Sequence, residues 1–482
     1  MSYDKLIFEI SKTGRIGHDL NINSNNLSNI PKELLREEEL LLPEVSEPDV
    51  VRHYTNLSQK NFGVDTGFYP LGSCTTKYNP KINETIAALP GFHSIHPLTP
   101  EKHVQGALEV MYETDMMLAD VTGMDHFSLA PFAGAHGELV GLWIMKKYHE
   151  LRNDTKRTKI IVPDSAHGTN PASATVAGFS VIEVKSNDNG TVNIGSLKEV
   201  LNDEVAGIML TNPNTLGLFE PDILEMSKLV HEAGGLLYYD GANLNPMLGV
   251  TKPGMMGFDI IHLNVHKTFS TPHGGGGPGA GPVGVVSHLK EYLPGPIVIK
   301  EDNKYKFYTP IHSVGKTGQF YGNFSVIVKT NAYLKTVGNN INNLGKLSVL
   351  NGNYIKESLK EDYLLAFDKI CMHEVVFDGL KDKSNGVKTL DVAKRLLDYG
   401  VHPPTIYFPL NIKEAMMVEP VETESKETLD HFIDIMKTIA KEAKDSPELV
   451  KTAPHTTNVR RLDEALAARK PVLKFKDIEL QQ

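Results

Sequence analysis

The chain has 482 residues, which is too long for one compact core and predicts two domains with smaller appendages. Its net charge of −10 and its pI near 6.0 argue against nucleic acid or an anionic membrane as the main partner. It contains only two cysteines, Cys74 and Cys371, which excludes a disulfide framework and a four-thiolate zinc site. Because no apolar run is long enough to span a membrane and the start lacks a signal peptide's apolar core, we expect a cytoplasmic protein.

The first 61 residues are polar and irregular, and we interpret them as an extended arm that carries short helices. Such arms often wrap a partner subunit, although a loosely packed extension would have the same composition. Residues 68–80 are rich in glycine, proline and small hydroxyl side chains, which predicts a loop. Cys74 lies in this loop without an obvious neighbouring base, so we interpret it as packed and inert.

His93 and His96 have a spacing that can bind a metal when both lie on a helix. Gly91 and Pro97 disfavour a helix there, and no acid stands at a matching position. We therefore predict no metal site.

Residues 101–121 carry apolar side chains at helical spacing. Residues 132–138 are mostly small and lead into an apolar helix that we expect to begin near Leu139. Small residues that open onto a helix N-terminus expose backbone N–H groups and the positive end of the helix dipole, which together can hold a phosphate. A tight turn that only permits close packing would have the same sequence.

Strands and helices then alternate along the chain. Lys159–Pro163 is predicted to be a buried strand, and His167 follows in the loop after it. Val205–Leu210 and Leu236–Asp240 are predicted strands, separated by a helix that Pro221 opens. This βαβ unit implies parallel strands joined by a right-handed crossover.

Asp240 ends its apolar strand at the carboxyl edge of the predicted sheet, where open α/β sheets bind their ligands. A carboxylate at this edge can hold a pyridine nitrogen protonated, which makes pyridoxal phosphate an electron sink. An acid that caps the next helix is the structural alternative.

Lys267 follows an apolar run of Ile260, Ile261, Leu263 and Val265 that we read as the next strand, and a glycine-rich loop comes after it. Lysine forms Schiff bases when burial or a neighbouring cation lowers its pKa. A solvated lysine would have the same pattern. An acid followed by a lysine on the next strand is, however, the order expected in fold type I pyridoxal-phosphate enzymes.

From residue 329 onward the periodicity changes to amphipathic helices, including Thr389–Gly400, around a short strand near Thr405–Leu410. We expect an arm over residues 1–61, a large cofactor-binding domain over 62–328 and a smaller C-terminal α+β domain over 329–482.

Several motifs together resemble one family, the P-protein, which is the pyridoxal-phosphate-dependent glycine dehydrogenase (decarboxylating) of the glycine cleavage system. They are Gly-Ser-Cys-Thr at 72–75, Gly-Ala-His-Gly-Glu at 134–138, Ala-His-Gly-Thr-Asn-Pro at 166–171, Asp-Gly-Ala-Asn at 240–243, and His-Leu-Asn-Val-His-Lys-Thr at 262–268 with the polyglycine loop after it. The resemblance implies an α/β, fold type I transferase fold with a large, mostly parallel sheet. It also implies an oxidoreductase that decarboxylates glycine and uses a disulfide acceptor.

The family occurs as one long chain of two homologous halves or as two separate subunits. This chain is half-length and keeps the lysine, so it resembles the cofactor-bearing subunit 2. The implied partners are the homologous subunit 1, in a heterotetramer, and the lipoylated H-protein, whose lipoyl arm takes the aminomethyl group as CO2 leaves.

The resemblance also assigns roles to residues of this chain. Lys267 would bind the cofactor covalently with His266 beside it, Asp240 would pair with the pyridinium, and His167 and Ala242 would cover the two ring faces. Phosphate contacts would come from Ala133, Gly134, Ala135 and His136, and the contact with the 3′-oxygen from Thr211 or Asn212. His136 departs from the family pattern, where glutamine is more common, so its side-chain contacts are open.

Two alternatives belong to other functional classes. Another fold type I enzyme, such as an amino-acid decarboxylase, would share Lys267 and Asp240 but would not explain the Gly-Ser-Cys-Thr segment. A non-catalytic scaffold subunit would lack Lys267. Loop 318–323, with Tyr321 and Asn323, either reaches a cofactor across a dimer interface or is a surface turn.

Overall fold

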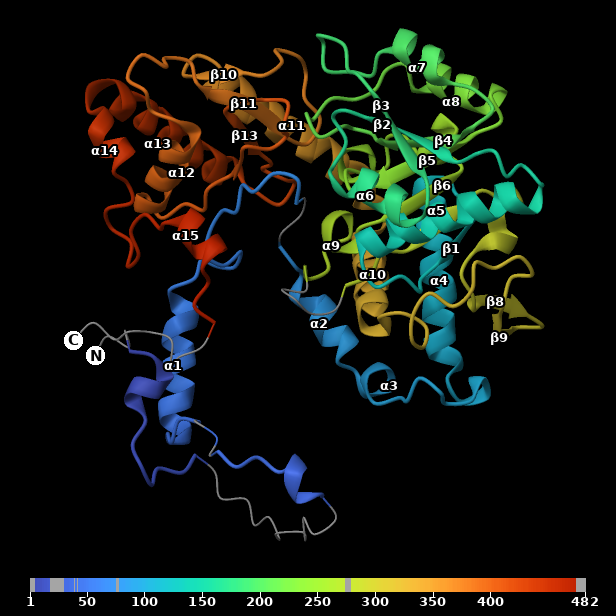
Figure 1. Ribbon diagram of the computed structural model, residues 1–482, viewed down its shortest axis with the longest axis horizontal. Coiled ribbons are helices and arrows are strands. Elements are labelled where there is room, and N and C mark those ends of the chain that lie inside the picture. The colour runs from blue at the N-terminus through green and yellow to red at the C-terminus, as the bar shows by residue number, and fades with distance from the viewer. Residues whose placement is uncertain are drawn as a thin grey trace. The chain divides into compact units, whose positions relative to one another are not determined.

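The computed structural model describes residues 5–17, 30–38, 40, 42–74, 78–273 and 279–473. The chain folds as two compact units (Figure 1). One unit comprises Met1–Gly67 and His455–Gln482, and the other comprises Phe68–Pro454. In the described part of the chain, no helix is long and apolar enough to cross a membrane.

The unit that contains both chain ends is helical where it is described. Its elements are η1 (Ile7–Ile10), η3 (Lys32–Leu34), α1 (Glu47–Gln59) and α15 (Glu464–Arg469). Helix α1 begins at the N-cap Ser46, whose hydroxyl accepts from Asp49 N. Arg15 Nη1 donates to Asp49 Oδ2 at 2.8 Å, which ties the preceding segment to this helix. The domain boundaries expected at residues 61 and 328 stay a prediction.

The second unit contains a seven-stranded sheet in the order β1-β7-β6-β5-β4-β2-β3. Its strands are β1 (His126–Ser128), β2 (Lys159–Pro163), β3 (Ser180–Val184), β4 (Val205–Thr211), β5 (Leu236–Gly241), β6 (Ile260–Leu263) and β7 (Val283–Val285). Only β7 runs against the other strands of this sheet. The βαβ arrangement from Val205 to Asp240 is therefore confirmed as parallel.

Helices cover both faces of this sheet. They are α4 (Gln105–Thr122), α5 (Gly134–Leu151), α6 (Thr169–Val176), α7 (Ile194–Val200), α8 (Ile223–Glu232) and α10 (Phe324–Val337), whereas the single turn α9 (Val265–Thr268) directly follows β6. Shorter helices and a hairpin surround them: α2 (Lys81–Ala87), α3 (Pro90–His93), η4 (Glu101–His103), η5 (Asn245–Met247), η6 (Pro253–Met256), η7 (Ser287–Tyr292), β8 (Ile297–Glu301) and β9 (Lys304–Tyr308).

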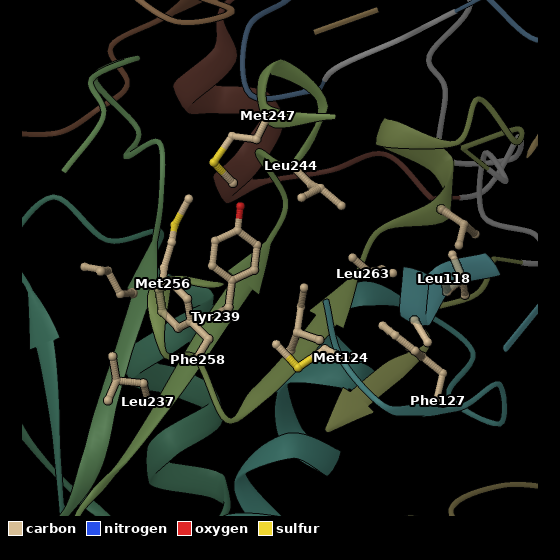
Figure 2. Close-up of a cluster of buried hydrophobic side chains, with 14 of the residues drawn as sticks. Leu118, Met124, Phe127, Leu237, Tyr239, Leu244, Met247, Met256, Phe258 and Leu263 are labelled. Carbon is tan, nitrogen blue, oxygen red and sulfur yellow. The ribbon is translucent and has the colours of Figure 1, made fainter. Parts of the chain in front are cut away.

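Side chains that alternate along the strands divide the core into two layers. Tyr238 and Ile260 pack on the face covered by α5 and α6. Tyr239 and Ile261 pack on the opposite face with side chains of α4, α7, α8 and α10. Figure 2 shows Tyr239 in this second layer, where its ring meets that of Phe258 at 4.8 Å between centroids. Both layers are needed, because a parallel sheet must be buried on its two faces.

A smaller antiparallel sheet follows, in the order β10-β11-β13-β12. Its strands are β10 (Tyr363–Leu365), β11 (Val375–Leu380), β12 (Thr405–Ile406) and β13 (Ala415–Val418). The helices in this part of the chain are η8 (Gly338–Asn340), α11 (Ile341–Leu359), α12 (Thr389–Asp398), α13 (Lys426–Asp445) and α14 (Pro447–Lys451). The expected fold class, a large, mostly parallel sheet with a smaller α+β part, is confirmed.

Several local expectations were wrong. The apolar run ends as a strand at Leu263, and Val265 already belongs to α9, because Asn264 accepts from Lys267 N and starts a helical turn. Helix α5 begins at Gly134 rather than near Leu139. Strand β12 stops at Ile406, since the next residue, Tyr407, has a φ of 56° and leaves the extended region.

A short helix, α3, forms at Pro90–His93, where we expected none. Proline occupies its first turn, where the missing N–H has no intrahelical acceptor to lose. His93 ends this helix and His96 lies beyond it, so the two side chains do not share a helix face.

Candidate active site

Three polar side chains form a row across neighbouring strands at the carboxyl edge of the large sheet. Thr211 of β4 is in register with Asp240 of β5, and Asp240 is in register with His262 of β6. Residues in register project to the same face of a sheet. All three are at least 95% buried. The expected placement of Asp240 at this edge agrees with the strand order.

Asp240 is 2% exposed and is held by several donors. Its Oδ1 accepts from Ala242 N at 3.0 Å, and its Oδ2 accepts from Asn170 Nδ2 at 3.0 Å. His262 Nε2 lies 3.4 Å from Oδ1. Burial alone would raise the pKa of Asp240, but the positive charge of His262, these hydrogen bonds and the charge of Lys267 hold the pKa below its usual value. The carboxylate therefore stays ionised at neutral pH.

His262 is fixed by two further contacts. Its Nε2 lies 2.8 Å from Asn264 Oδ1, and its Nδ1 lies 2.7 Å from the Tyr238 hydroxyl. An amide oxygen only accepts, so Nε2 carries a hydrogen. The ring is thus oriented with an N–H group toward the neighbourhood of the Asp240 carboxylate.

Lys267 lies in the single turn of α9, directly after β6. Its side chain is half-buried, and within the described residues its ammonium group forms neither an ion pair nor a hydrogen bond. His266 precedes it, and burial together with the charges of His273, Lys267 and His262 lowers the pKa of His266 to about 3. His266 is therefore neutral at physiological pH. A lysine without a partner beside an anionic aspartate is a suitable covalent anchor for a carbonyl compound.

The N-terminus of α5 lies against this lysine turn. A Cβ at Gly134 would come within 2.0 Å of Asn264 Nδ2, and a Cβ at Gly281 within 2.0 Å of Ala133 O. The first intrahelical bond runs from Gly137 N to Ala133 O at 2.9 Å, so the amide groups before it are free of helical partners. Ala133 and Ala135 are exposed. The start of α5 therefore has exposed backbone at Ala133 and Ala135, and its role as a phosphate cradle stays a prediction.

His136 has a structural role in this turn. Its Nδ1 accepts from Phe132 N at 3.1 Å, and its ring stacks on that of Phe132 at 6.0 Å. Burial lowers the pKa of His136, while a hydrogen bond with the backbone of Thr317 raises it. The side chain therefore stabilises the turn from within.

His167 lies in the loop between β2 and α6, and its Nδ1 is 2.9 Å from Thr169 Oγ1. Its ring also meets that of Phe408, in the part with the smaller sheet, at 5.6 Å. Thr169 Oγ1 donates to Glu138 Oε1 at 2.9 Å, and Asn170 Nδ2 donates to Glu138 Oε2 at 3.1 Å. His167 and Asp240 are thus linked through one network of polar groups, of which Glu138, Asn170 and Asp240 are buried and His167 and Thr169 half-buried.

Sequence reasoning missed the members of this network other than His167 and Asp240: Glu138, Thr169, Asn170, His262 and Asn264. Glu138 reads as one polar residue in an apolar helix, and His262 as one in an apolar strand. A polar side chain on the buried face of a predicted element was the signal that could have indicated them, because such groups need partners.

Thr211 and Asn212 differ in their availability to a ligand. Thr211 Oγ1 is buried and has no hydrogen-bond partner within the described residues. Asn212 Oδ1 accepts from Glu220 N at 3.0 Å, and its Nδ2 faces Met256 Sδ at 3.9 Å. Asn212 is therefore engaged with groups on the opposite face of the sheet, and Thr211 is the one of the pair that belongs to the row of polar side chains.

The segment around residues 68–80 approaches the lysine turn, although Thr75 and Lys77 lie outside the described residues. Asn79 Nδ2 donates to Ser270 O at 3.1 Å, and the Ser270 hydroxyl donates to Tyr78 O. Ser73 N donates to Glu374 Oε2 at 3.0 Å. The segment is therefore bound at one end by the residue that precedes β11 of the small sheet and at the other by the residues that follow the lysine turn.

The remaining motifs bring fewer contacts. The polyglycine residues 274–277 lie outside the described residues. In loop 318–323, Tyr321 stacks on Phe307 at 4.1 Å, and Asn323 Nδ2 donates to Gly279 O. Both side chains are therefore engaged within this chain, and their reach across a dimer interface stays a prediction.

The fold and this site define the class: an α/β protein with the architecture of fold type I transferases. Residues 15–307 match the family described as glycine cleavage system P-protein, and residues 344–461 match the glycine dehydrogenase C-terminal domain. The chain belongs to the glycine cleavage system P-protein family. The resemblance inferred from the motifs is confirmed.

Curated relatives match nearly the whole chain, among them two proteins of the same name. A probable glycine dehydrogenase (decarboxylating) subunit 2 of Caldanaerobacter subterraneus subsp. tengcongensis is 63% identical over 479 residues, which cover 98% of this chain and 99% of that protein. A protein of the same name from Alkaliphilus oremlandii is 61% identical over 478 residues, covering 98% of each.

Two solved structures share the fold. A crystal structure of glycine decarboxylase (P-protein) of the glycine cleavage system, in inhibitor-bound form, superposes with a TM-score of 0.72 at 19% identity, covering 86% of this chain and 94% of that one. A NifS-like protein gives a TM-score of 0.61 at 14% identity, covering 78% and 99%. At these identities the likeness shows the fold alone.

Proposed function

We infer that this chain decarboxylates glycine as the cofactor-bearing subunit of a two-subunit P-protein. Relatives named glycine dehydrogenase (decarboxylating) subunit 2 match it over 98% of its length at 61% and 63% identity. In the structure, the observation that carries the activity is that an ionised Asp240 on β5 and Lys267 just after β6 lie at the ends of neighbouring strands, and that the Lys267 ammonium has no partner among the described residues.

We propose pyridoxal 5′-phosphate as the cofactor, because the donors at this edge fit its functional groups. Lys267 would hold it covalently, and Asp240 would face the pyridine nitrogen. The free amide groups at the start of α5 suit the phosphate, because a helix N-terminus attracts anions. The buried hydroxyl of Thr211, which has no partner in the described part of the chain, suits the 3′-oxygen.

When bound, pyridoxal phosphate supplies a protonated ring that accepts the electrons of the Cα–carboxylate bond. Asp240 would keep the ring nitrogen protonated, since its lowered pKa keeps it anionic in a site with little water. His167 would cover one face of the ring and Ala242 the other. His266, neutral because of its depressed pKa, would add no charge beside Lys267.

We further propose that the aminomethyl group passes to the lipoyl arm of a lipoylated H-protein, and that the homologous subunit 1 completes the enzyme. The name subunit 2 in both relatives supports a partner chain. The N-terminal segment exposes aliphatic side chains that suit a protein interface, among them Leu34 at 73% and Leu42 at 70% exposure. The cytoplasmic location expected from the sequence stays a prediction.

Exchange of carbon between glycine and labelled bicarbonate tests the function. It should be negligible for this chain alone and appear when subunit 1 and lipoylated H-protein are added. Full exchange with H-protein alone would remove the need for subunit 1. No exchange under any combination would contradict the proposed reaction.

Borohydride reduction of the cofactor-loaded protein, followed by peptide mapping, tests the anchor. The pyridoxyl group should be found on Lys267. A label on Lys316 instead would overturn the assignment of the site.

A further inference from the structure

Glu138 is a buried carboxylate on α5 that the reaction above does not use. It is 5% exposed. Three side chains of the first turns of α6 donate to it: Thr169 Oγ1 at 2.9 Å, Asn170 Nδ2 at 3.1 Å and Ser173 Oγ at 3.1 Å. Within the described residues, no cation forms an ion pair with it. A carboxylate buried among neutral donors is costly to place and needs a reason beyond packing.

The first branch of this cluster leads to His167. Thr169 Oγ1 donates its single hydroxyl hydrogen to Glu138 Oε1 at 2.9 Å. Thr169 Oγ1 in turn lies 2.9 Å from His167 Nδ1. Thr169 N donates to the same ring nitrogen at 3.2 Å, so both the side chain and the backbone of Thr169 contact His167. Glu138 thereby holds the Thr169 side chain that contacts His167.

The second branch leads to Asp240. The Asn170 amide donates one hydrogen to Glu138 Oε2 at 3.1 Å and the other to Asp240 Oδ2 at 3.0 Å. Both acceptors are carboxylates, so turning the amide over would put its oxygen against two negative groups. Asn170 Oδ1 is buried without a partner in the described chain, so Glu138 and Asp240 alone hold the amide in this orientation. Without the Glu138 carboxylate, one of these two restraints is gone.

We propose that Glu138 is a positioning residue that aligns Asp240, through Asn170, and His167, through Thr169, from one carboxylate. This inference rests on the proposed function, because it assigns Asp240 and His167 to the pyridine nitrogen and the ring face. Glu138 itself touches neither reacting group. It acts by removing the freedom of two side chains that do, which is how supporting hydrogen bonds sharpen a site.

Glu138→Gln tests the proposal. The glutamine NH2 group replaces one carboxylate oxygen, so the hydrogen bond from either Thr169 or Asn170 loses its acceptor. In the complex with subunit 1 and H-protein, we expect kcat of glycine–bicarbonate exchange to fall about 10- to 100-fold. The KM for glycine should change by less than about threefold, because binding of glycine is not removed. The pH midpoint of the visible absorbance of the cofactor-loaded chain should shift by at least about half a unit.

Ser173→Ala is the matched control, because Ser173 donates to the same carboxylate but leads to neither Asp240 nor His167. It should lower thermal stability and leave both kcat and the absorbance midpoint unchanged. If Glu138→Gln does not fold, Thr169→Val cuts only the His167 branch and should lower cofactor affinity several-fold.

The outcomes separate this inference from the proposed function. Glu138→Gln with a lower melting temperature but wild-type kcat and absorbance midpoint would reduce Glu138 to a packing role. Thr169→Val with unchanged cofactor affinity would remove the His167 branch. A wild-type chain that binds no pyridoxal phosphate would instead overturn the proposed function.

Discussion

Gly134 and Asn264 pack so closely that a Cβ on Gly134 would lie 2.0 Å from Asn264 Nδ2. The contact joins the start of α5 to the residue that begins the lysine turn, so the proposed phosphate cradle and the covalent anchor share one rigid junction. Gly134→Ala must displace one of the two. We expect a loss of about 1–3 kcal/mol in stability and about a tenfold loss in pyridoxal-phosphate affinity.

Calorimetry and fluorescence titration measure the two effects. Gly106→Ala is the control, since a Cβ there meets nothing within 4 Å and Gly106 lies in α4. It should leave cofactor affinity unchanged and stabilise the chain by up to about 1 kcal/mol. Wild-type affinity in Gly134→Ala would show that the helix start can shift without consequence for the cofactor.

Asp240→Asn should retain the cofactor but lose turnover. The asparagine amide is neutral, so it provides no negative charge opposite the pyridine nitrogen. Its NH2 group also has to face an N–H donor, either that of Ala242 or that of Asn170. We expect exchange activity to fall at least about a hundredfold, as when a preorganised electrostatic group is removed. Activity within a few-fold of wild type would exclude the electron-sink role.

Asp259→Asn provides the comparison for Asp240→Asn. Asp259 is another buried acid, 6% exposed, next to the start of β6, where its Oδ2 accepts from Leu237 N at 2.7 Å and pairs with His231. Its substitution should lower the melting temperature and leave exchange per folded enzyme unchanged. This contrast distinguishes loss of catalysis from loss of a buried acid in the same sheet.

How much the sequence could predict follows from how far apart the cooperating residues lie. Asp240 and Lys267 were predictable, because each ends an apolar run and adjacent parallel strands bring such ends to one edge. Glu138, Asn170 and His262 were not, since their partners are 32, 70 and 24 residues away and depend on register and helix placement. The secondary-structure propensity of a residue carries no information on strand register or on where a helix packs.

The helix start at Gly134 shows the same limit in the fold. Glycine and histidine are weak helix formers, so the sequence favoured a later start near Leu139. Gly134 and Gly137 nonetheless belong to α5, because Asn264 and Gly281 approach them too closely for larger residues. Tertiary packing therefore overrides local preference at the position where the cradle is needed.

Substitutions of Thr211 and Asn212 should have different effects, because Thr211 is a proposed contact of the cofactor and Asn212 supports the fold. Thr211→Val removes a hydroxyl that has no partner in the described chain, so apo stability should hold or rise slightly. Cofactor affinity should fall about 2- to 10-fold, the worth of one hydrogen bond. Equilibrium titration with pyridoxal phosphate measures this.

Asn212→Ala should show the reverse pattern. It leaves Glu220 N without its acceptor, at a cost of about 1–3 kcal/mol in stability, with a smaller effect on cofactor affinity. A larger affinity loss in Asn212→Ala than in Thr211→Val would assign the 3′-oxygen contact to Asn212.

Glu220 should make stability depend on pH near neutrality. Glu220 is 1% exposed, and burial raises the pKa of its carboxyl group to about 7. The hydrogen bond from Val192 N and the charge of Lys369 lower this pKa, and the charge of Asp222 raises it. The unfolded chain has an ordinary glutamate, so between about pH 4.5 and 7 the folded state binds more protons. Stability then falls as pH rises through this window, and the full penalty persists above it.

Glu220→Gln should remove that penalty, because a neutral amide still accepts from Val192 N and never ionises. We expect wild type and variant to unfold alike near pH 4.5, and the variant to be up to about 3 kcal/mol more stable at pH 8. Glu225→Gln is the control, because Glu225 is an exposed glutamate of α8 that pairs with Lys198. The difference in its free energy of unfolding from wild type should be the same at all pH values in this range. Thermal unfolding from pH 4.5 to 8 measures the difference, and a constant offset between Glu220→Gln and wild type would show that Glu220 does not titrate in this range.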